Sequence, residues 1–246
     1  MKKFLVLDVE GYSDCRPYDL GFIVTDKNGT EHEAHSVGIL PACYENLERR
    51  LERLANPAME TPNEMAHRNI REIMTETDGK YLVVRDIDKL YYAFLGVIEK
   101  HDIKRIWAYN CAFDRGALNR LFGDERFSII DKRMQFCDII PAITHTHLLS
   151  ADYINFCKEN GFVTAKGNIK TTAEIVFRYL SGNIAFEEAH TGLEDVRIEK
   201  QILLKAMEKT KSPHYKPIAA WKIIREFCVV NGIELPIPSF EDMVSD

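Results

Sequence analysis

Four carboxylates and one histidine in this chain have the residue types and spacing for metal-dependent chemistry. Asp8 and Glu10 end a short apolar run, Asp114 closes the segment NCAFD, and His190 precedes Asp195 by four intervening residues. Acids gathered at one point repel one another and resist burial, so such a cluster is stable when cations neutralise it. If the fold brings the three segments together, they indicate metal-assisted phosphoryl transfer.

Strand geometry predicts that Asp8 and Glu10 lie on the same side of the sheet. Residues 4–9 read as a strand, and alternation along it places Asp8 and Glu10 on one face at the carboxyl end. Ligands of open α/β sheets usually bind at that end of the strands. Many exposed strands also end in acids, so the pair indicates a site only together with the other two segments.

The other two segments each have a structural alternative. Asp114 falls where a strand gives way to a helix, so it can turn back toward the sheet, stabilise the helix N-terminus, or do both. Thr191 and Glu194 match a capping box, which puts Asp195 in the first turns of a helix and His190 in the loop before it. Taken alone, His190 would be read as a loop histidine and Asp195 as an ordinary acid at a helix start.

Hydrophobic periodicity predicts an α/β protein. The first forty residues read as three antiparallel strands, with a hairpin turn at 26–29 (DKNG). Strands then alternate with helices, which is typical of a sheet with helices on both faces. The expected strands are 4–9, 19–25, 30–40, 105–110 and 135–140, the last stopped by Pro141, and the expected helices are 44–56, 87–100, 113–122, 150–160, 172–180, 193–207 and 216–230.

Composition narrows the class of protein. The 246 residues suffice for one full-sized core, and the net charge of −6 argues against a general nucleic-acid coat protein. No apolar stretch approaches the roughly 20 residues that span a bilayer, and the start does not resemble a signal peptide, so we expect a cytoplasmic protein. The six cysteines form no C-x-x-C pair, which favours reduced, buried thiols. Five basic residues between 115 and 133 are either a solvated face or contacts to a substrate backbone.

The three acidic segments together resemble the DEDDh branch of the DnaQ-like 3′→5′ exonucleases, within the RNase H-like superfamily. LDVE matches the first motif (D-x-E), NCAFD the second (N-x-x-F-D) and HTGLED the third (H-x-x-x-x-D), in family order. The related DEDDy branch has a tyrosine four positions before the last acid, where this chain has Thr191. The resemblance covers about residues 3–208. It implies an RNase H-like α/β fold with a five-stranded mixed sheet and helices on both faces.

The resemblance also implies a mechanism and a set of residue roles. Two divalent cations, Mg²⁺ or Mn²⁺, would be held by the four carboxylates, and His190 would be the general base that takes a proton from water. Substrate-binding candidates are Gly11, Tyr12, Asn110 and Phe113, although a packed tyrosine is the simpler reading of Tyr12. The expected partners are 3′ ends of single-stranded nucleic acid, with release of nucleoside 5′-monophosphates. A second copy of the chain or a polymerase remain candidate protein partners, and no membrane is expected.

Several alternatives stay open. An exonuclease-like module could bind nucleic acid or a polymerase without turnover, and an endonuclease or RNase H could use the same core. The histidines at 32, 35, 145 and 147 read as ordinary polar positions. We expect one exonuclease domain over 1–210, with 41–85 an insertion or lid and 211–246 a helical extension and tail. The motifs do not distinguish DNA from RNA.

Overall fold

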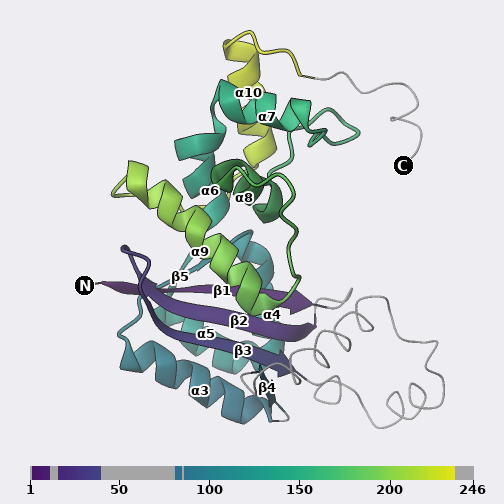
Figure 1. Ribbon diagram of the computed structural model, residues 1–246. Helices are drawn as coiled ribbons and strands as arrows, with labels where there is room; N and C mark the ends of the chain where they lie inside the picture. Colours follow the sequence, from purple (N-terminus) through teal and green to yellow (C-terminus); the bar gives the residue numbers. More distant parts are fainter. Residues whose placement is uncertain (1, 12–15, 40–80, 85, 236–246) are drawn as a thin grey trace, which may run out of the picture. The chain divides into compact units, whose positions relative to one another are not determined.

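The computed structural model describes residues 2–11, 16–39, 81–84 and 86–235 (Figure 1). The chain divides into two compact units. The first comprises Met1–Phe136 and Ala189–Arg197, and the second comprises Cys137–Glu188 and Ile198–Asp246. All five residues expected to form the site belong to the first unit. The expected helix at 44–56 lies outside the described residues, and the expected domain boundary at 210 stays a prediction.

A mixed six-stranded sheet organises the described part of the chain. Its order is β4-β3-β2-β1-β5-β6, with β1 and β2 antiparallel, β2 and β3 antiparallel, and β5 and β4 parallel to β1 and β3 respectively. The strands are β1 (Lys3–Gly11), β2 (Pro17–Asp26), β3 (Glu31–Ile39), β4 (Tyr81–Val84), β5 (Arg105–Ala108) and β6 (Gln135–Asp138).

The predicted fold class is confirmed, because the strands β3-β2-β1-β5-β6 form a mixed sheet consistent with an RNase H-like fold. The strand β4 is an addition at one edge. It falls within the segment 41–85 that we expected to be an insertion or lid, and its residues instead pair with β3 from Ser36 to Ile39. The hairpin turn is also confirmed, since Gly29 donates its amide to the Asp26 carbonyl at 2.9 Å and has a φ of 80°.

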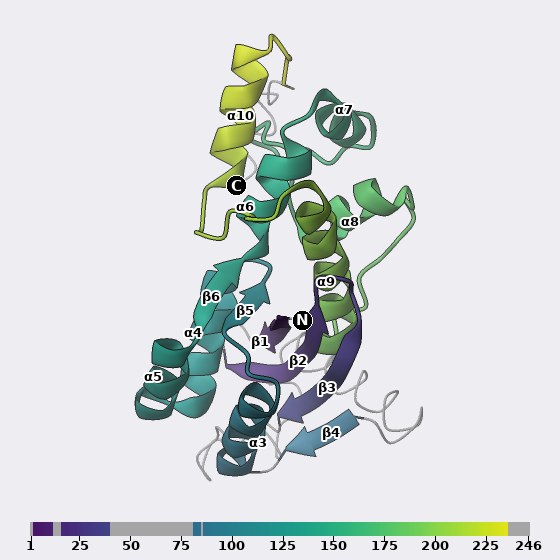
Figure 2. The same ribbon diagram turned by 90° about the vertical axis from the view of Figure 1, so that its left-hand side faces the viewer.

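Alternation along β1 divides the sheet into two faces. Leu5, Leu7 and Val9 join a buried apolar cluster with side chains of α3 (Ile87–Lys100) and α4 (Cys111–Phe122). The helices α3 and α4 cover this face, as Figure 2 shows. Asp8 and Glu10 therefore belong to the opposite face, as the sequence predicts.

The end of one strand and the presence of one helix differ from expectation. The strand β6 ends at Asp138, whose carboxylate accepts the Ile140 amide at 2.9 Å and starts the short helix α6 (Ile139–Ile143). Pro141 therefore lies in the first turn of a helix, where its missing N–H costs nothing, and does not stop a strand. The helix α5 (Asp124–Arg133) was not expected, because its pattern is mostly polar.

The second unit is helical in its described part. The remaining helices are α7 (Ala151–Glu159), α8 (Ala173–Ser181), α9 (Gly192–Lys209), α10 (Ala220–Val230) and a π-helical turn, η3 (Thr144–Leu148). The helix α9 starts in the first unit and continues into the second. Four cysteines of the described ranges, Cys111, Cys137, Cys157 and Cys228, are buried and form no disulfide bond. Within these ranges no helix is both long and apolar enough to cross a membrane.

Candidate metal centre

The strand β1 presents both of its acids to the face opposite the apolar cluster. In the antiparallel register with β2, Asp8 is paired with Gly21 and Glu10 with Asp19. The register shifts between Glu10 and Gly11, which marks a bulge at the end of the strand. Bulges often re-aim side chains next to active sites, and here the bulge directly follows the second acid.

Asp114 reaches the same end of the sheet from the helix α4. Because β5 runs parallel to β1, the residues that follow β5 begin beside the carboxyl end of β1. The Asp114 side chain is 1% exposed, and its Oδ1 accepts the backbone N–H of Val9 at 3.0 Å. Val9 lies between the two acids of β1, so Asp114 connects the helix start to the acidic pair. The prediction that Asp114 turns back to the sheet is thus confirmed.

His190 and Asp195 enter the site from the start of α9. The helix begins at Gly192, so His190 lies outside it, as predicted, with a left-handed backbone φ of 52°. The predicted capping box is wrong. Thr191 Oγ1 is buried and has no hydrogen-bond partner among the described residues, and Glu194 pairs instead with Arg197 one turn along.

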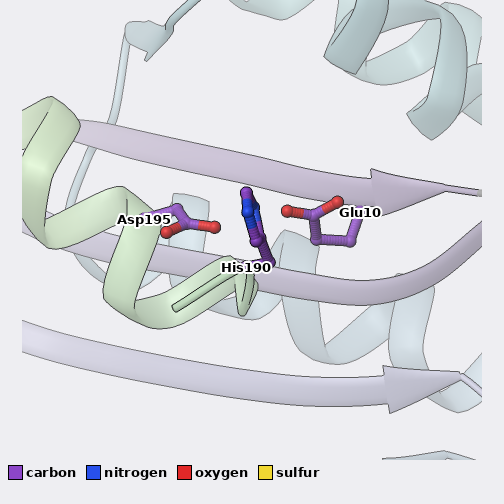
Figure 3. Close-up of side chains that lie close together, drawn as sticks. All are labelled: Glu10, His190 and Asp195. Atoms are coloured by element: carbon purple, nitrogen blue, oxygen red, sulfur yellow. The ribbon is translucent and has the colours of Figure 1, made fainter. Parts of the chain in front are cut away.

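Glu10, His190 and Asp195 converge on one point. Each offers a ligand atom, and these atoms all lie within 4.8 Å of one another. Figure 3 shows the imidazole of His190 between the two carboxylates. The structure therefore gathers three of the five predicted residues from two segments far apart in sequence. Asp8 and Asp114 are outside this group. Asp8 nevertheless lies on the same face of β1 as Glu10, and Asp114 accepts a hydrogen bond from the Val9 amide, between Asp8 and Glu10.

These donors fit hard divalent cations. The carboxylate oxygens of Glu10 and Asp195 suit Mg²⁺ or Mn²⁺, which prefer oxygen ligands, and no cysteine belongs to the group. Two Mg²⁺–O bonds of about 2.1 Å span roughly 4.2 Å across one ion, so ligand atoms that lie within 4.8 Å of one another are close enough to share a cation. Glu10, Asp195, Asp8 and Asp114 are the residues that would hold such ions.

Three of the four substrate-binding candidates lie in described segments that follow β1 or β5. Gly11 ends β1 after the bulge, and Asn110 is exposed with a left-handed φ of 62° just before α4. Phe113 is 39% exposed although it is a large apolar residue beside the buried Asp114. Tyr12 lies outside the described residues. Phe113 therefore has exposed aromatic surface one residue before Asp114.

Sequence reasoning missed three residues that position the site. The carboxylate of Asp19, on β2, accepts the Gly192 amide at 3.2 Å, and a Cβ added to Gly21 would overlap the backbone of Gly192. The signal was present in the sequence, because a glycine inside a strand often marks the close approach of another backbone. Asp19 itself gave no signal, since acids near strand starts are common.

The basic residues between 115 and 133 are engaged with acids in three cases. Arg115 binds Asp131 through two hydrogen bonds of 2.6 and 2.7 Å, and this contact raises the pKa of the Arg115 guanidinium. Arg126 pairs with Asp88 and Arg133 with Glu99. These partners favour the reading of this face as a solvated, ion-paired surface. The histidines at 32 and 35 likewise contact carboxylates, those of Asp26 and Glu33.

Comparisons with protein families and with curated proteins find no relative of this chain. No protein-family model matches the sequence, and a search of curated proteins finds no match.

Proposed function

We propose that this protein is a metal-dependent 3′→5′ exonuclease of the DEDDh type, which hydrolyses phosphodiester bonds at the 3′ end of single-stranded DNA or RNA. The observation that carries the proposal is the convergence of Glu10, His190 and Asp195 within 4.8 Å. The order of the three motifs in the sequence and an α/β fold consistent with the RNase H-like class support it.

The carboxylates have a binding role in this proposal. Glu10 and Asp195, with Asp8 and Asp114, would hold two divalent cations. Bound cations would supply Lewis-acid stabilisation of the phosphate charge and would lower the pKa of a coordinated water. The amide of Val9 keeps the Asp114 carboxylate oriented toward the acidic pair, because a hydrogen bond in a buried setting restricts its rotation.

His190 has a proton-transfer role. Its imidazole lies next to two carboxylates and is exposed, so a water molecule can reach it. An imidazole is able to accept a proton near neutral pH, which suits it to deprotonate the attacking water. The bond formed is between the water oxygen and phosphorus, and the bond broken is between phosphorus and the 3′ oxygen. The products are a nucleoside 5′-monophosphate and a strand shortened by one nucleotide with a 3′-hydroxyl.

The binding of a free 3′ end is supported by the groups beside the acids. Phe113, with 39% of its surface exposed, offers an aromatic face on which a terminal base can stack. Asn110 is exposed next to it and can donate or accept hydrogen bonds.

A degradation assay tests the proposal directly. Linear oligonucleotides of DNA and RNA, labelled at the 5′ or the 3′ end, are incubated with the full chain and Mg²⁺ or Mn²⁺, beside circular strands of the same sequence. We expect a ladder from the 5′-labelled strand, early release of labelled mononucleotide from the 3′-labelled strand, and intact circles. Asp8→Ala and His190→Ala test the site, and Glu187→Gln, which changes an exposed acid elsewhere, is the matched control.

Each outcome of this assay decides between functions. Cleavage of the circles would replace the exonuclease with an endonuclease on the same core. Turnover that persists in Asp8→Ala would remove the proposed site. Inertness of the wild-type chain with both metals and both sugars would leave the binding module without turnover as the better reading.

A further inference from the structure

Asp19 is a buried carboxylate attached to the first residue of α9. It lies on β2, is 1% exposed, and its Oδ2 accepts the Gly192 amide at 3.2 Å. The first N–H groups of a helix have no partner within the helix and carry partial positive charge. The Asp19 carboxylate satisfies one of these groups from a strand that is distant in sequence.

Backbone contact reinforces this attachment. A Cβ on Gly21 would overlap the carbonyl carbon of Gly192, and a Cβ on Gly192 would lie 2.5 Å from the Gly21 nitrogen. The strand β2 and the start of α9 therefore touch without any side chain between them. Glycine is required at both positions because only it allows two backbones to approach so closely.

The residues that flank Gly192 are those of the proposed site. His190 is two residues before it, in a left-handed conformation that residues with a Cβ rarely adopt. Asp195 is three residues after it, within the first turn of the helix. Such a backbone persists only where the surroundings hold it, and Thr191 does not supply the cap, since its Oγ1 finds no hydrogen-bond partner in the described ranges.

Asp19 has a second acid opposite it in the sheet. Glu10 is directly opposite Asp19 in the register of β1 and β2, and two ionised carboxylates at such a position would repel each other. An uncharged acceptor would satisfy the Gly192 amide without this repulsion. The acid is favoured, however, by the positive end of the α9 dipole, which attracts the carboxylate.

We propose that Asp19 is a positioning residue of the site, which holds Gly192 and thereby fixes His190 and Asp195 against Glu10. This inference rests on the proposed function, because it assigns Asp19 a role in the same reaction. Asp19 does not belong to the group of ligand atoms and acts through the backbone of α9.

The test compares two substitutions at Asp19 with one matched control in the full chain. Asp19→Ala removes the acceptor, whereas Asp19→Asn keeps an oxygen that can accept the Gly192 amide. Asp138 is the control position, because it is 4% exposed and accepts the Ile140 amide at the start of another helix. Asp138→Ala therefore measures how much activity is lost when a buried carboxylate at the start of another helix is removed. Asp138 belongs to none of the three motifs.

Two quantities are measured under conditions in which circular dichroism shows every variant to be folded. The first is kcat with the labelled oligonucleotide, and the second is the ¹H–¹³C resonance of the His190 ring, assigned with His190→Gln. We expect Asp19→Ala to lower kcat by about 10–100-fold with KM within about 3-fold, and to shift or broaden the His190 resonance. We expect Asp19→Asn to recover most of both, and Asp138→Ala to change neither.

The outcomes separate this inference from the proposed function. An Asp19→Ala protein with a wild-type His190 resonance, or with wild-type kcat, would overturn the positioning role even if the exonuclease activity is present. If the wild-type chain has no activity, the proposed function fails, and the His190 resonance alone then decides whether Asp19 positions that side chain.

Discussion

Glu10 and Asp19 face each other across β1 and β2, and their carboxylates serve two different segments of the same site. Glu10 offers a ligand atom to the group that includes His190 and Asp195, while Asp19 accepts the Gly192 amide between those two residues. Of these two paired residues, Glu10 is thus a member of the group, and Asp19 contacts the segment that carries its other two members. A hydrogen bond therefore joins the sheet to the start of α9 beside the residues of the proposed site.

Replacement of His190 should separate proton transfer from binding. We expect His190→Ala to lower kcat by about 10²–10⁴-fold, because general-base catalysis commonly contributes that much. KM for a short single-stranded oligonucleotide should change by less than about 3-fold. Initial-rate kinetics with Mg²⁺ measure both parameters, and His214→Ala, an exposed histidine of the second unit, is the control. A change confined to KM would assign His190 to substrate binding.

Binding of Mn²⁺ should depend on the carboxylates of the group. Glu10→Gln and Asp195→Asn each remove a negative charge while keeping the side-chain volume, so we expect Mn²⁺ affinity to fall by at least about 10-fold in each variant. Electron paramagnetic resonance of free Mn²⁺ measures the affinity without any substrate. Equal affinities in the wild-type chain, both variants and the Glu187→Gln control would contradict a cation site here.

Asp114 should have separable effects on stability and on activity. Asp114→Ala leaves the buried Val9 amide without its acceptor, so we expect unfolding to become easier by about 1–3 kcal/mol. Asp114→Asn keeps an oxygen that can accept this hydrogen bond but lacks the charge, so stability should change less while activity is lost. Urea denaturation and the oligonucleotide assay measure the two effects. Full activity of Asp114→Asn would exclude Asp114 as a ligand.

The contact between Gly21 and Gly192 should tolerate no side chain. A methyl group on Gly21 would overlap the Gly192 backbone, so we expect Gly21→Ala to destabilise the protein by about 1–3 kcal/mol and to lower activity. Gly96 on α3 is the control, because a Cβ there meets nothing within 4 Å. Gly96→Ala should leave activity unchanged and stabilise the helix slightly. Thermal unfolding compares the two variants, and equal melting temperatures would contradict the close backbone approach.

Glu33 should make stability depend on acid pH. The hydrogen bond from Lys100, at 2.7 Å, and those from His101 and His35 lower the pKa of Glu33 from 4.5 to about 2. Because the folded protein has the lower pKa, this contribution is complete above about pH 4.5 and is lost as the pH falls toward 2. We expect a loss of about 1–2 kcal/mol, reduced by the exposure of Lys100. Urea denaturation of the wild-type chain and Glu33→Gln at pH 6 and pH 3 measures it, and equal slopes against pH would refute the assignment.

Most elements of the first unit could be predicted from the sequence because their signals are local. Alternation identified the face of β1 that carries Asp8 and Glu10, and apolar spacing predicted α3 from Ile87 to Lys100 with the bounds that the structure has. The short strand β4 and the helix α5 were missed. Four residues give little periodicity, and a polar helix whose apolar face is narrow lacks the usual stripe.

The sequence by itself determined which residues could do the chemistry, the face of β1 that carries two of them, and the position of His190 outside the helix of Asp195. Only the tertiary structure decided how those residues are held. The hydrogen bond from Gly192 to Asp19 joins positions 173 residues apart, and the bond from Val9 to Asp114 joins positions 105 apart. Such partners depend on strand register and on backbone approach, which no local pattern encodes. For this reason the capping box that the sequence predicted at Thr191 gives way to a carboxylate from β2.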